Sequence, residues 1–224
     1  DADLVKKIFN TSQAGNYLDE ATGKRTGANI LHLTRSLDEM AQELGMELSQ
    51  IEADLDRVRQ KLHAVRAQRI RPLLDDKILT DWNGLMIAAL ARAGRALNRH
   101  DYLKAAEDAA GFLLGNLKDD RGRLLHRFRD GEAAIAGMLE DVAFLTFGLI
   151  ELYEASRKPA YLEQALALTR ESLVHFWDHE HGGFFTSADD GEQLLVRQKE
   201  VLDGAIPSGN SMALLNLLKL SLLT

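Results

Sequence analysis

The sequence predicts an all-α protein in which helical hairpins stack side by side and curve into an α/α toroid. Apolar residues recur with three–four spacing from about Ser36 onward, which indicates amphipathic helices. One pattern of helix, turn and helix occurs twice at a fixed distance, which is typical of stacked helical hairpins. The loops between these hairpins are long and mixed in composition, which favours a toroid over an open helical array with short loops.

Two helices are predicted before the repeat. The motifs SLDE (36–39) and SQIE (49–52) each place a glutamate three residues after a serine, as in a capping box. Gly45 lies between them and is expected to end the first helix. The second helix should run from about Gln50 to near Arg69. The segment before these helices is predicted to be a loop that could hold a short strand.

The repeat consists of HDYLKAAEDAAGFLL and PAYLEQALALTRESL, which begin at His100 and Pro159 and therefore lie 59 residues apart. The helices before them align at the same offset. Helix–turn–helix units are thus predicted over residues 81–118 and 138–176. Pro159 suits the first position of a helix, and Asp101 suits an N-cap.

A third unit should begin with the helix near Ser208, and the helix at 50–69 would be the second half of an earlier unit. The loops at 119–137 and 178–207 are long enough to be functional. In the second loop, GGFFTS and QLLVRQK are predicted to pair as a small β-ribbon around ADDGE.

We expect residues 1–224 to form a single helical-hairpin domain that is part of a larger toroid. The last helix ends in LLKLSLLT without a glycine, a basic last turn or a proline. A helix this apolar needs cover on most of its surface, so we expect a longer polypeptide; the alternative is a short helix that ends inside the core. The open side would expose, or pair with another copy of the chain in a homo-oligomer, Leu214, Leu217, Leu218 and Leu222.

The composition argues against several classes of function. The net charge is −7 with no basic block, so no nucleic-acid surface is expected. The chain has no cysteine, which excludes disulfides, thiolate metal sites and thiol catalysis. No apolar run reaches the ~20 residues of a membrane span. The histidines of HFWDHEHGG (175–183) lack a regular ligand spacing, so neither a metal nor a cofactor is predicted. We expect a cytoplasmic location.

A polar segment precedes the first helix of each unit: DDKILTDWNG (75–84), GMLEDVA (137–143) and DGAIPSGNS (203–211). Equivalent helices of stacked hairpins run parallel, so the three segments should converge at one end, where the helices also present unpaired N–H groups. We expect the shared hollow to hold Asp75, Asp76, Lys77, Trp82, Asn83, Glu140, Asp141, Asp203, Ser208, Asn210 and Ser211, with Arg197 and Lys199 able to offset the acids.

Acids, amides, hydroxyls and an indole together suit a neutral polyhydroxylated ligand such as a carbohydrate. If the site is catalytic, the proton donor would be Asp76 or Glu140. The base or nucleophile would be Asp203 or Asp141. His126, on a possible ribbon beside the hollow, could also act as a base. The residues expected to hold the sugar are Lys77, Trp82, Asn83, Arg197, Ser208 and Asn210.

Structural roles compete with each of these assignments. Asp81 and Ser208 suit N-caps, and Asp141 suits a first helical turn. Trp82 could fill the core instead of facing a ligand. The pair Asp75–Asp76 could form an ion network with the nearby basic residues Arg69, Arg71 and Lys77. The functional hypothesis therefore depends on the convergence of the three segments.

Several segments resemble the spermatogenesis-associated, thioredoxin-domain-containing proteins. They are RIRPLLDDKILTDWNGLMIAALARAG, GMLEDVAFLTFGLIELYEA, HGGFF, LLVRQKEVLDGAIPSGNS and the GN of AGNYLDE. The resemblance implies part of an (α/α)6 barrel of the six-hairpin glycosidase and N-acylglucosamine 2-epimerase type. It also implies a thioredoxin-like domain that lies outside this chain. The sequence departs from the expected pattern at Glu140 and Val142, where that family would have an aspartate and a tyrosine. No catalytic residue is carried over.

The leading hypothesis is a carbohydrate-binding or carbohydrate-active toroid of the glycoside hydrolase or sugar epimerase type. A different class of function competes with it: a non-catalytic interaction module that serves the thioredoxin-like domain of the longer protein. A plain helical scaffold is the third possibility. A bound sugar that faces at least two carboxylates would favour the first hypothesis.

Overall fold

The computed structural model describes residues 2–224 and divides the chain into two compact units, with the boundary in the sequence between Leu74 and Asp75. Each unit is described by itself. The expectation of one domain over residues 1–224 stays a prediction.

The first unit contains α1 (Ala2–Ile8), α2 (Leu37–Leu44) and α3 (Leu48–Ala67). Ser36 caps α2 through the expected capping box with Glu39, and Gly45 ends α2 with a φ of 62°. The predicted capping box at 49–52 is wrong: α3 begins at Leu48, and no side chain caps it. The small core of this unit consists of Ile8, Met40, Ala41, Ile51 and Leu55.

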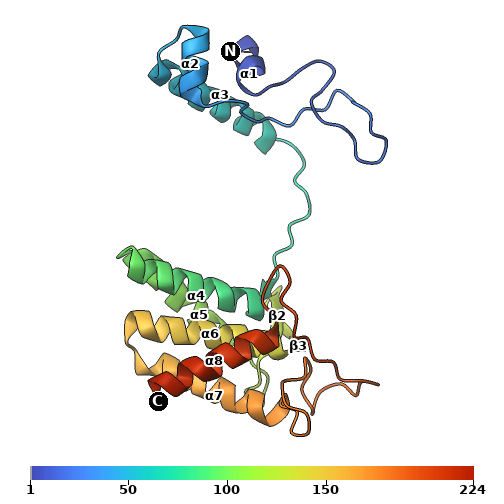
Figure 1. Ribbon diagram of the computed structural model, residues 1–224, viewed down its shortest axis with the longest axis vertical. Coiled ribbons are helices and arrows are strands. Elements are labelled where there is room, and N and C mark those ends of the chain that lie inside the picture. Colours follow the sequence, from blue (N-terminus) through green and yellow to red (C-terminus); the bar gives the residue numbers. More distant parts are fainter. Residues whose placement is uncertain (1) are drawn as a thin grey trace. The chain divides into compact units, whose positions relative to one another are not determined.

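The second unit contains the predicted hairpins, shown in Figure 1. They are α4 (Thr80–Ala96) with α5 (His100–Asn116) and α6 (Leu139–Ser156) with α7 (Pro159–His175), followed by α8 (Gly209–Leu223). The starts of α4 and α6 lie 59 residues apart, as do those of α5 and α7, so the repeat is confirmed. Pro159 is the first residue of α7, as expected.

Two predicted helix caps are wrong. α4 begins one residue before Asp81, and α5 begins one residue before Asp101, so neither aspartate is an N-cap. Asp101 instead pairs with Arg99, whose Nη2 lies 2.6 Å from its Oδ2. The N-caps are Leu79 and Arg99, so each lies two residues before the predicted aspartate, which is within the usual uncertainty of a helix end.

The helices α4, α6 and α8 run in the same direction. The backbone N–H of Asp81, at the start of α4, donates to Asp141 Oδ1 at the start of α6 over 3.1 Å. At the far ends, Glu154 of α6 pairs with Arg95 of α4 at 3.3 Å and with Lys219 of α8 at 3.2 Å. In Figure 1 the starts of all three helices lie at the end that carries β2 and β3. The predicted convergence of the three helix starts is therefore confirmed.

Glycines permit the close approach of α4 and α6. A Cβ atom on Gly84 would come within 2.5 Å of the backbone of Phe144 and Leu145, and one on Gly148 would come within 2.6 Å of the Gly84 carbonyl oxygen. Side chains at these two positions would force the helices apart. The core that surrounds this contact includes Ile87, Phe144, Leu145 and Leu149, all fully buried.

A small antiparallel sheet covers the starts of the helices. Its strands are β1 (Ile78–Leu79), β2 (Leu125–Arg129) and β3 (Glu132–Ala136), in the order β1-β2-β3. Asp130 and Gly131 connect β2 to β3 with φ angles of 52° and 81°, which suit a type I′ hairpin turn. The sheet brings His126, the second residue of β2, beside α4 and α6.

The β-ribbon predicted in the second long loop is wrong. Between residues 178 and 207, all of which the structure describes, no strand forms. A single backbone bond of 2.8 Å, from Thr186 N–H to the Gln198 carbonyl, joins the two segments. The side chains of Asn210 and Arg197 hold this loop instead. No helix among residues 2–224 has both the length and the apolar character that crossing a membrane requires.

Substitution of Gly148 by alanine should destabilise the second unit. The added methyl group would press on the backbone of α4, and overpacking of this kind costs roughly 1–3 kcal/mol. The matched control is Gly111→Ala in α5, where an added Cβ meets no heavy atom of the described residues within 4 Å. The control should gain roughly 0.5–1 kcal/mol, because alanine is the better helix former. Thermal unfolding of both variants measures the difference, and a neutral Gly148→Ala would contradict the close packing of α4 on α6.

Candidate functional site

The carboxylate of Asp141 joins the start of α6 to the start of α4 and to β2. Only 1% of its surface is exposed. Its Oδ1 accepts the N–H of Asp81 over 3.1 Å, and its Oδ2 accepts the N–H of Met138 over 2.8 Å. The Nδ1 atom of His126 lies 2.9 Å from Oδ1 and 3.1 Å from Oδ2. A buried carboxylate is thus fully provided with hydrogen-bond donors.

This contact orients the imidazole of His126. Because Nδ1–H donates its hydrogen bond to the carboxylate, the second ring nitrogen, Nε2, is left for another partner. The hydrogen bond to Asp141 raises the pKa of His126, and the nearby charge of Asp81 acts in the same direction, whereas partial burial opposes the shift. The sheet keeps this geometry, since Thr80 Oγ1 donates to the carbonyl of Leu125 over 2.6 Å.

Two further carboxyl groups at these helix starts hold their protons more strongly than usual. Burial raises the pKa of Asp81, and the negative charge of Asp141 adds to the effect. Burial also raises the pKa of Glu140. Asp81 Oδ1 accepts the N–H of Trp82 over 2.7 Å. Asp81 and Glu140 therefore keep their protons to a higher pH than exposed carboxyl groups do.

The start of α8 completes the group. The backbone of Gly209 lies beside the carboxyl group of Glu140 and opposes the rise in its pKa. A Cβ atom on Gly209 would lie only 2.9 Å from Glu140 Oε1 and from the side chain of Leu139, so this close approach requires glycine. We define the mouth as Asp81, Trp82, His126, Glu140, Asp141 and Gly209.

The mouth also offers donor atoms for a metal ion. Asp81, His126 and Asp141 each provide one ligand atom, and these atoms lie within 4.8 Å of one another. However, both oxygens of Asp141 already accept backbone N–H groups, and His126 Nδ1 faces the same carboxylate. This arrangement suits a proton-binding cluster better than a set of free metal ligands.

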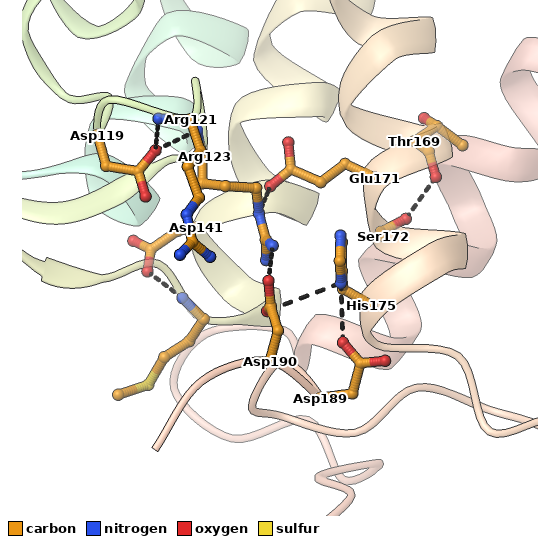
Figure 2. Close-up of polar contacts among 11 residues, drawn as sticks. Asp119, Arg121, Arg123, Asp141, Thr169, Glu171, Ser172, His175, Asp189 and Asp190 are labelled. Carbon is orange, nitrogen blue, oxygen red and sulfur yellow. Dashed lines mark hydrogen bonds and ion pairs between the residues drawn. The ribbon is translucent and has the colours of Figure 1, made fainter.

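A second cluster of histidine and aspartate ties the long loop to α7. His175 Nδ1 lies 2.8 Å from Asp189, and the ligand atoms of His175, Asp189 and Asp190 lie close together. Figure 2 shows that Arg123 bridges Glu171 and Asp190 at 2.7 Å and 2.8 Å. The guanidinium of Arg123 beside Asp190 opposes the binding of a cation, so the geometry fits an ion network that fastens the loop.

Of the residues predicted to bind or process a ligand, four lie at the mouth or next to it. Glu140 and Asp141 belong to the mouth itself. Trp82 is 61% exposed, so the alternative in which it fills the core is wrong. Asn83 lies in the first turn of α4, where its Nδ2 donates to the carbonyl of Leu79 over 2.8 Å.

The predicted acids and bases at the edge of the site have structural partners. Asp76 lies 2.9 Å from Arg129 Nε, and Lys77 pairs with Asp75 at 3.0 Å. The Lys77–Asp75 pair belongs to the ion network that the sequence left open, whereas Arg129, the partner of Asp76, was not among the basic residues expected there.

The carboxylate of Asp203 accepts the N–H of Ser208 over 2.9 Å. Ser208 in turn caps α8 by accepting the N–H of Ser211 over 3.2 Å. Both side chains therefore serve the start of α8.

Asn210 and Arg197 fix the loop between α7 and α8. Asn210 Oδ1 accepts the N–H of Phe184 over 2.7 Å, and its Nδ2 donates to the carbonyls of Phe184 and Glu200. Arg197 donates to backbone carbonyls of the same loop and of His175, and its guanidinium lies 4.2 Å from the ring centre of Phe185. These bonds replace the ladder of the predicted ribbon.

Two members of the mouth were missed or undervalued from the sequence. The sequence suggests a cap for Asp81, and it offers His126 as a possible base on a ribbon beside the hollow but without a partner. The offset of 60 residues between Asp81 and Asp141, close to the repeat of 59, is the signal that could have paired them. No local pattern would have brought His126 to Asp141.

A strained residue lies opposite His126 in the sheet. The register of β2 and β3 pairs Leu125 with Ala136 and Arg127 with Ala134, which places Ile135 across from His126. Ile135 has a φ of 68°, a value that β-branched residues rarely adopt. Such strain costs on the order of 1–3 kcal/mol and often occurs beside functional groups.

Solved structures with the same arrangement of helices are sugar enzymes of the α/α barrel class. A family 105 glycoside hydrolase from C. acetobutylicum superposes with a TM-score of 0.54 at 17% identity, over 84% of this chain and 55% of that one. A cellobiose 2-epimerase from Bacillus thermoamylovorans gives 0.50 at 18% identity, over 63% of this chain and 37% of that one. At this level of identity the likeness defines the fold, and the expected α/α toroid is confirmed.

The sequence relatives confirm the resemblance that its motifs suggested. Human spermatogenesis-associated protein 20 is 36% identical over 229 residues, which is 97% of this chain and 29% of that protein. An uncharacterised Caenorhabditis elegans protein is 32% identical over 228 residues, 97% of this chain and 31% of that protein. This chain is therefore a homologue of spermatogenesis-associated protein 20, and it spans about 30% of the length of these relatives. No protein-family model matches it.

Replacement of Asp141 by asparagine should lower the pKa of His126, because the carboxylate is the main cause of its upward shift. A histidine whose folded-state pKa is raised stabilises the fold fully below its unfolded pKa of about 6.5, and this contribution is lost as the pH rises through the folded-state pKa. The variant should therefore be less stable than the wild type, by roughly 1–3 kcal/mol, with the largest deficit at the acidic end of a pH 5.5–9 series.

NMR titration of His126 and urea unfolding at each pH measure the two effects. Asp101→Asn is the control, because Asp101 pairs with Arg99 on the surface and such pairs contribute little. An unchanged His126 pKa in Asp141→Asn would contradict the assigned contact.

Proposed function

We propose that the mouth binds a carbohydrate and transfers a proton to or from it. The observation that carries this proposal is the grouping of a histidine oriented by a buried carboxylate with two carboxyl groups of raised pKa. Perturbed acids and an oriented histidine in one place are typical of proton-transfer sites. The exposed indole of Trp82, next in sequence to Asp81, supplies an apolar face of the kind that covers the C–H side of a sugar ring.

The roles follow from the chemistry of each group. Glu140 is the proposed proton donor, because burial makes its carboxyl group keep a proton to higher pH. His126 is the proposed base, acting through Nε2 while Asp141 holds Nδ1. Asp141 is a positioning residue, since its oxygens are occupied by donors from the protein. Asp76 and Asp203 are not assigned to catalysis, because each already has a structural partner.

The class of ligand is supported by two considerations. The net charge of −7 and the acids of the mouth disfavour a phosphate-rich ligand, whereas hydroxyl groups can hydrogen-bond to carboxylates and imidazole alike. The solved structures of the same fold are a glycoside hydrolase and a cellobiose 2-epimerase. This similarity of fold favours a carbohydrate over other neutral ligands, although it does not define a reaction.

The test combines NMR titration with a panel of neutral and acidic mono- and disaccharides and assays for hydrolysis and epimerisation. A ligand should shift the signals of Trp82 and His126, and Trp82→Ala should weaken binding about tenfold, or about 1.4 kcal/mol. Glu140→Gln and His126→Gln should lower turnover by roughly 10²- to 10⁴-fold while binding persists. Asp101→Asn is the control, because Asp101 lies at the start of α5, close to the end of α4 that is away from the mouth. If no sugar perturbs the mouth at millimolar concentration, the proposal is wrong.

A second function is favoured by the surface of α8. Leu214, Leu218 and Leu222 form a stripe with 55%, 59% and 78% of their surfaces exposed, and Leu217 is partly buried. A continuous apolar stripe suits contact with another protein. In this alternative the chain is a non-catalytic module that docks a thioredoxin-like domain of the longer protein through α8.

Leu218→Glu should abolish binding of an isolated thioredoxin-like domain from a full-length relative, because it places a charge in the centre of the stripe. Titration of that domain against the chain, followed by NMR, measures the contact, and Glu163→Ala on α7 is a polar control. Light scattering of the chain alone provides a separate outcome: self-association that Leu218→Glu removes would assign the stripe to a second copy of the chain and contradict the docking of a thioredoxin-like domain.

A further inference from the structure

A small cavity lies between α6, α7 and α8, within the core of the second unit. It has about 10 Å³ of room for the centre of a water molecule. Apolar side chains form most of its wall, but each helix also contributes polar atoms, from Thr146 on α6, Thr169 and Ser172 on α7 and Asn216 on α8. No charged side chain lines it. The cavity is therefore polar, neutral and about the size of one water.

Two of these polar groups are buried without a partner. Thr146 Oγ1 and Asn216 Oδ1 have no hydrogen bond to any atom of residues 2–224, although only 2% of the surface of either residue is exposed. Nearly all buried polar atoms in proteins are hydrogen-bonded, to protein or to ordered water. Two unpartnered atoms on the wall of one cavity indicate that something inside it binds them.

The remaining bonds show what that occupant must donate and accept. Asn216 Nδ2 donates to the carbonyl of Ala143 over 2.7 Å, which orients the amide and leaves Oδ1 as an acceptor. Thr169 Oγ1 donates to the Ala165 carbonyl and Ser172 Oγ donates to the Thr169 carbonyl, both over 2.8 Å; Figure 2 draws the second bond. Each of these hydroxyl oxygens can still accept. The hydroxyl of Thr146 has a proton to donate.

We propose that a single water molecule binds in this cavity and links α8 to the α6–α7 hairpin. The water donates to Asn216 Oδ1 and to the oxygen of Thr169 or Ser172, and it accepts from the hydroxyl of Thr146. Three bonds are the usual number for a buried water. An organic ligand does not fit in this volume, and a cation would find no carboxylate.

This water helps to position the start of α8 at the mouth. Asn216 lies two helical turns after Gly209, which packs against Glu140. The water and the Asn216–Ala143 bond therefore hold the same stretch of α8 against α6 that presents Gly209 to the mouth. Loss of the water should loosen α8 without changing any residue of the mouth.

High-resolution crystal structures of the wild type and of Thr146→Val test the proposal. The wild type should show one water within hydrogen-bond distance of both Thr146 Oγ1 and Asn216 Oδ1. Thr146→Val keeps the shape of the side chain but removes the hydroxyl, so the water should be lost or displaced. Thr146→Ser is the matched control and should retain the water. The melting temperature of Thr146→Val should fall by about 2–4 °C relative to the wild type, as expected for the loss of one buried hydrogen bond in a domain of this size.

Two results would overturn the proposal. The first is an empty cavity in the wild type in which Thr146 donates to a carbonyl of its own helix. The second is a Thr146→Val protein whose cavity keeps the same water. Nuclear Overhauser contacts between water and the amides of α6 and α8 provide the same decision in solution if crystals are not obtained.

Discussion

The organisation of the second unit depends on the carboxylate of Asp141. It is a negative charge with almost no contact with solvent, and such a charge is costly unless donors surround it. The donors come from three places that are distant in sequence: Asp81 at the start of α4, Met138 at the start of α6 and His126 on β2. Because one buried carboxylate needs all of these donors, two helix starts and a strand must lie close together. The mouth forms where they meet.

The same contact explains why the mouth has unusual electrostatics. The hydrogen bond to Asp141 raises the pKa of His126, and the charge of Asp141 adds to the effect of burial, which is the main cause of the raised pKa of Asp81. Glu140 is affected mainly by burial, against the side of α8 that begins with Gly209. One position thus holds groups that bind protons to different degrees, and this difference is what proton-transfer chemistry uses.

Close packing keeps α4 and α6 aligned along their length. Gly84 and Gly148 let α4 and α6 approach until backbone meets backbone, so the two helix starts cannot slide past one another without breaking that contact. The ion pairs of Glu154 with Arg95 and Lys219 mark the same alignment at the far end. The polar cavity between α6, α7 and α8 contributes to the same alignment, because the water proposed to bind there links α8 to the α6–α7 hairpin.

The sequence by itself determined the helices, the repeat and the class of fold. These features rest on local patterns: the spacing of apolar residues, Ser36 and Gly45 at the ends of α2, and Pro159 at the start of α7. It also located the mouth, because parallel helices must begin at the same end. Only the tertiary structure decided which polar side chains remain available there. Asp203 looked like a base or nucleophile but serves the start of α8, and Asn210 and Arg197 looked like ligand-binding residues but hold the backbone of a loop. His126 looked isolated but contacts Asp141. The reason is physical: a helix forms from the residues adjacent in sequence, whereas the partner of a buried polar atom is whatever donor or acceptor the fold brings within 3 Å of it.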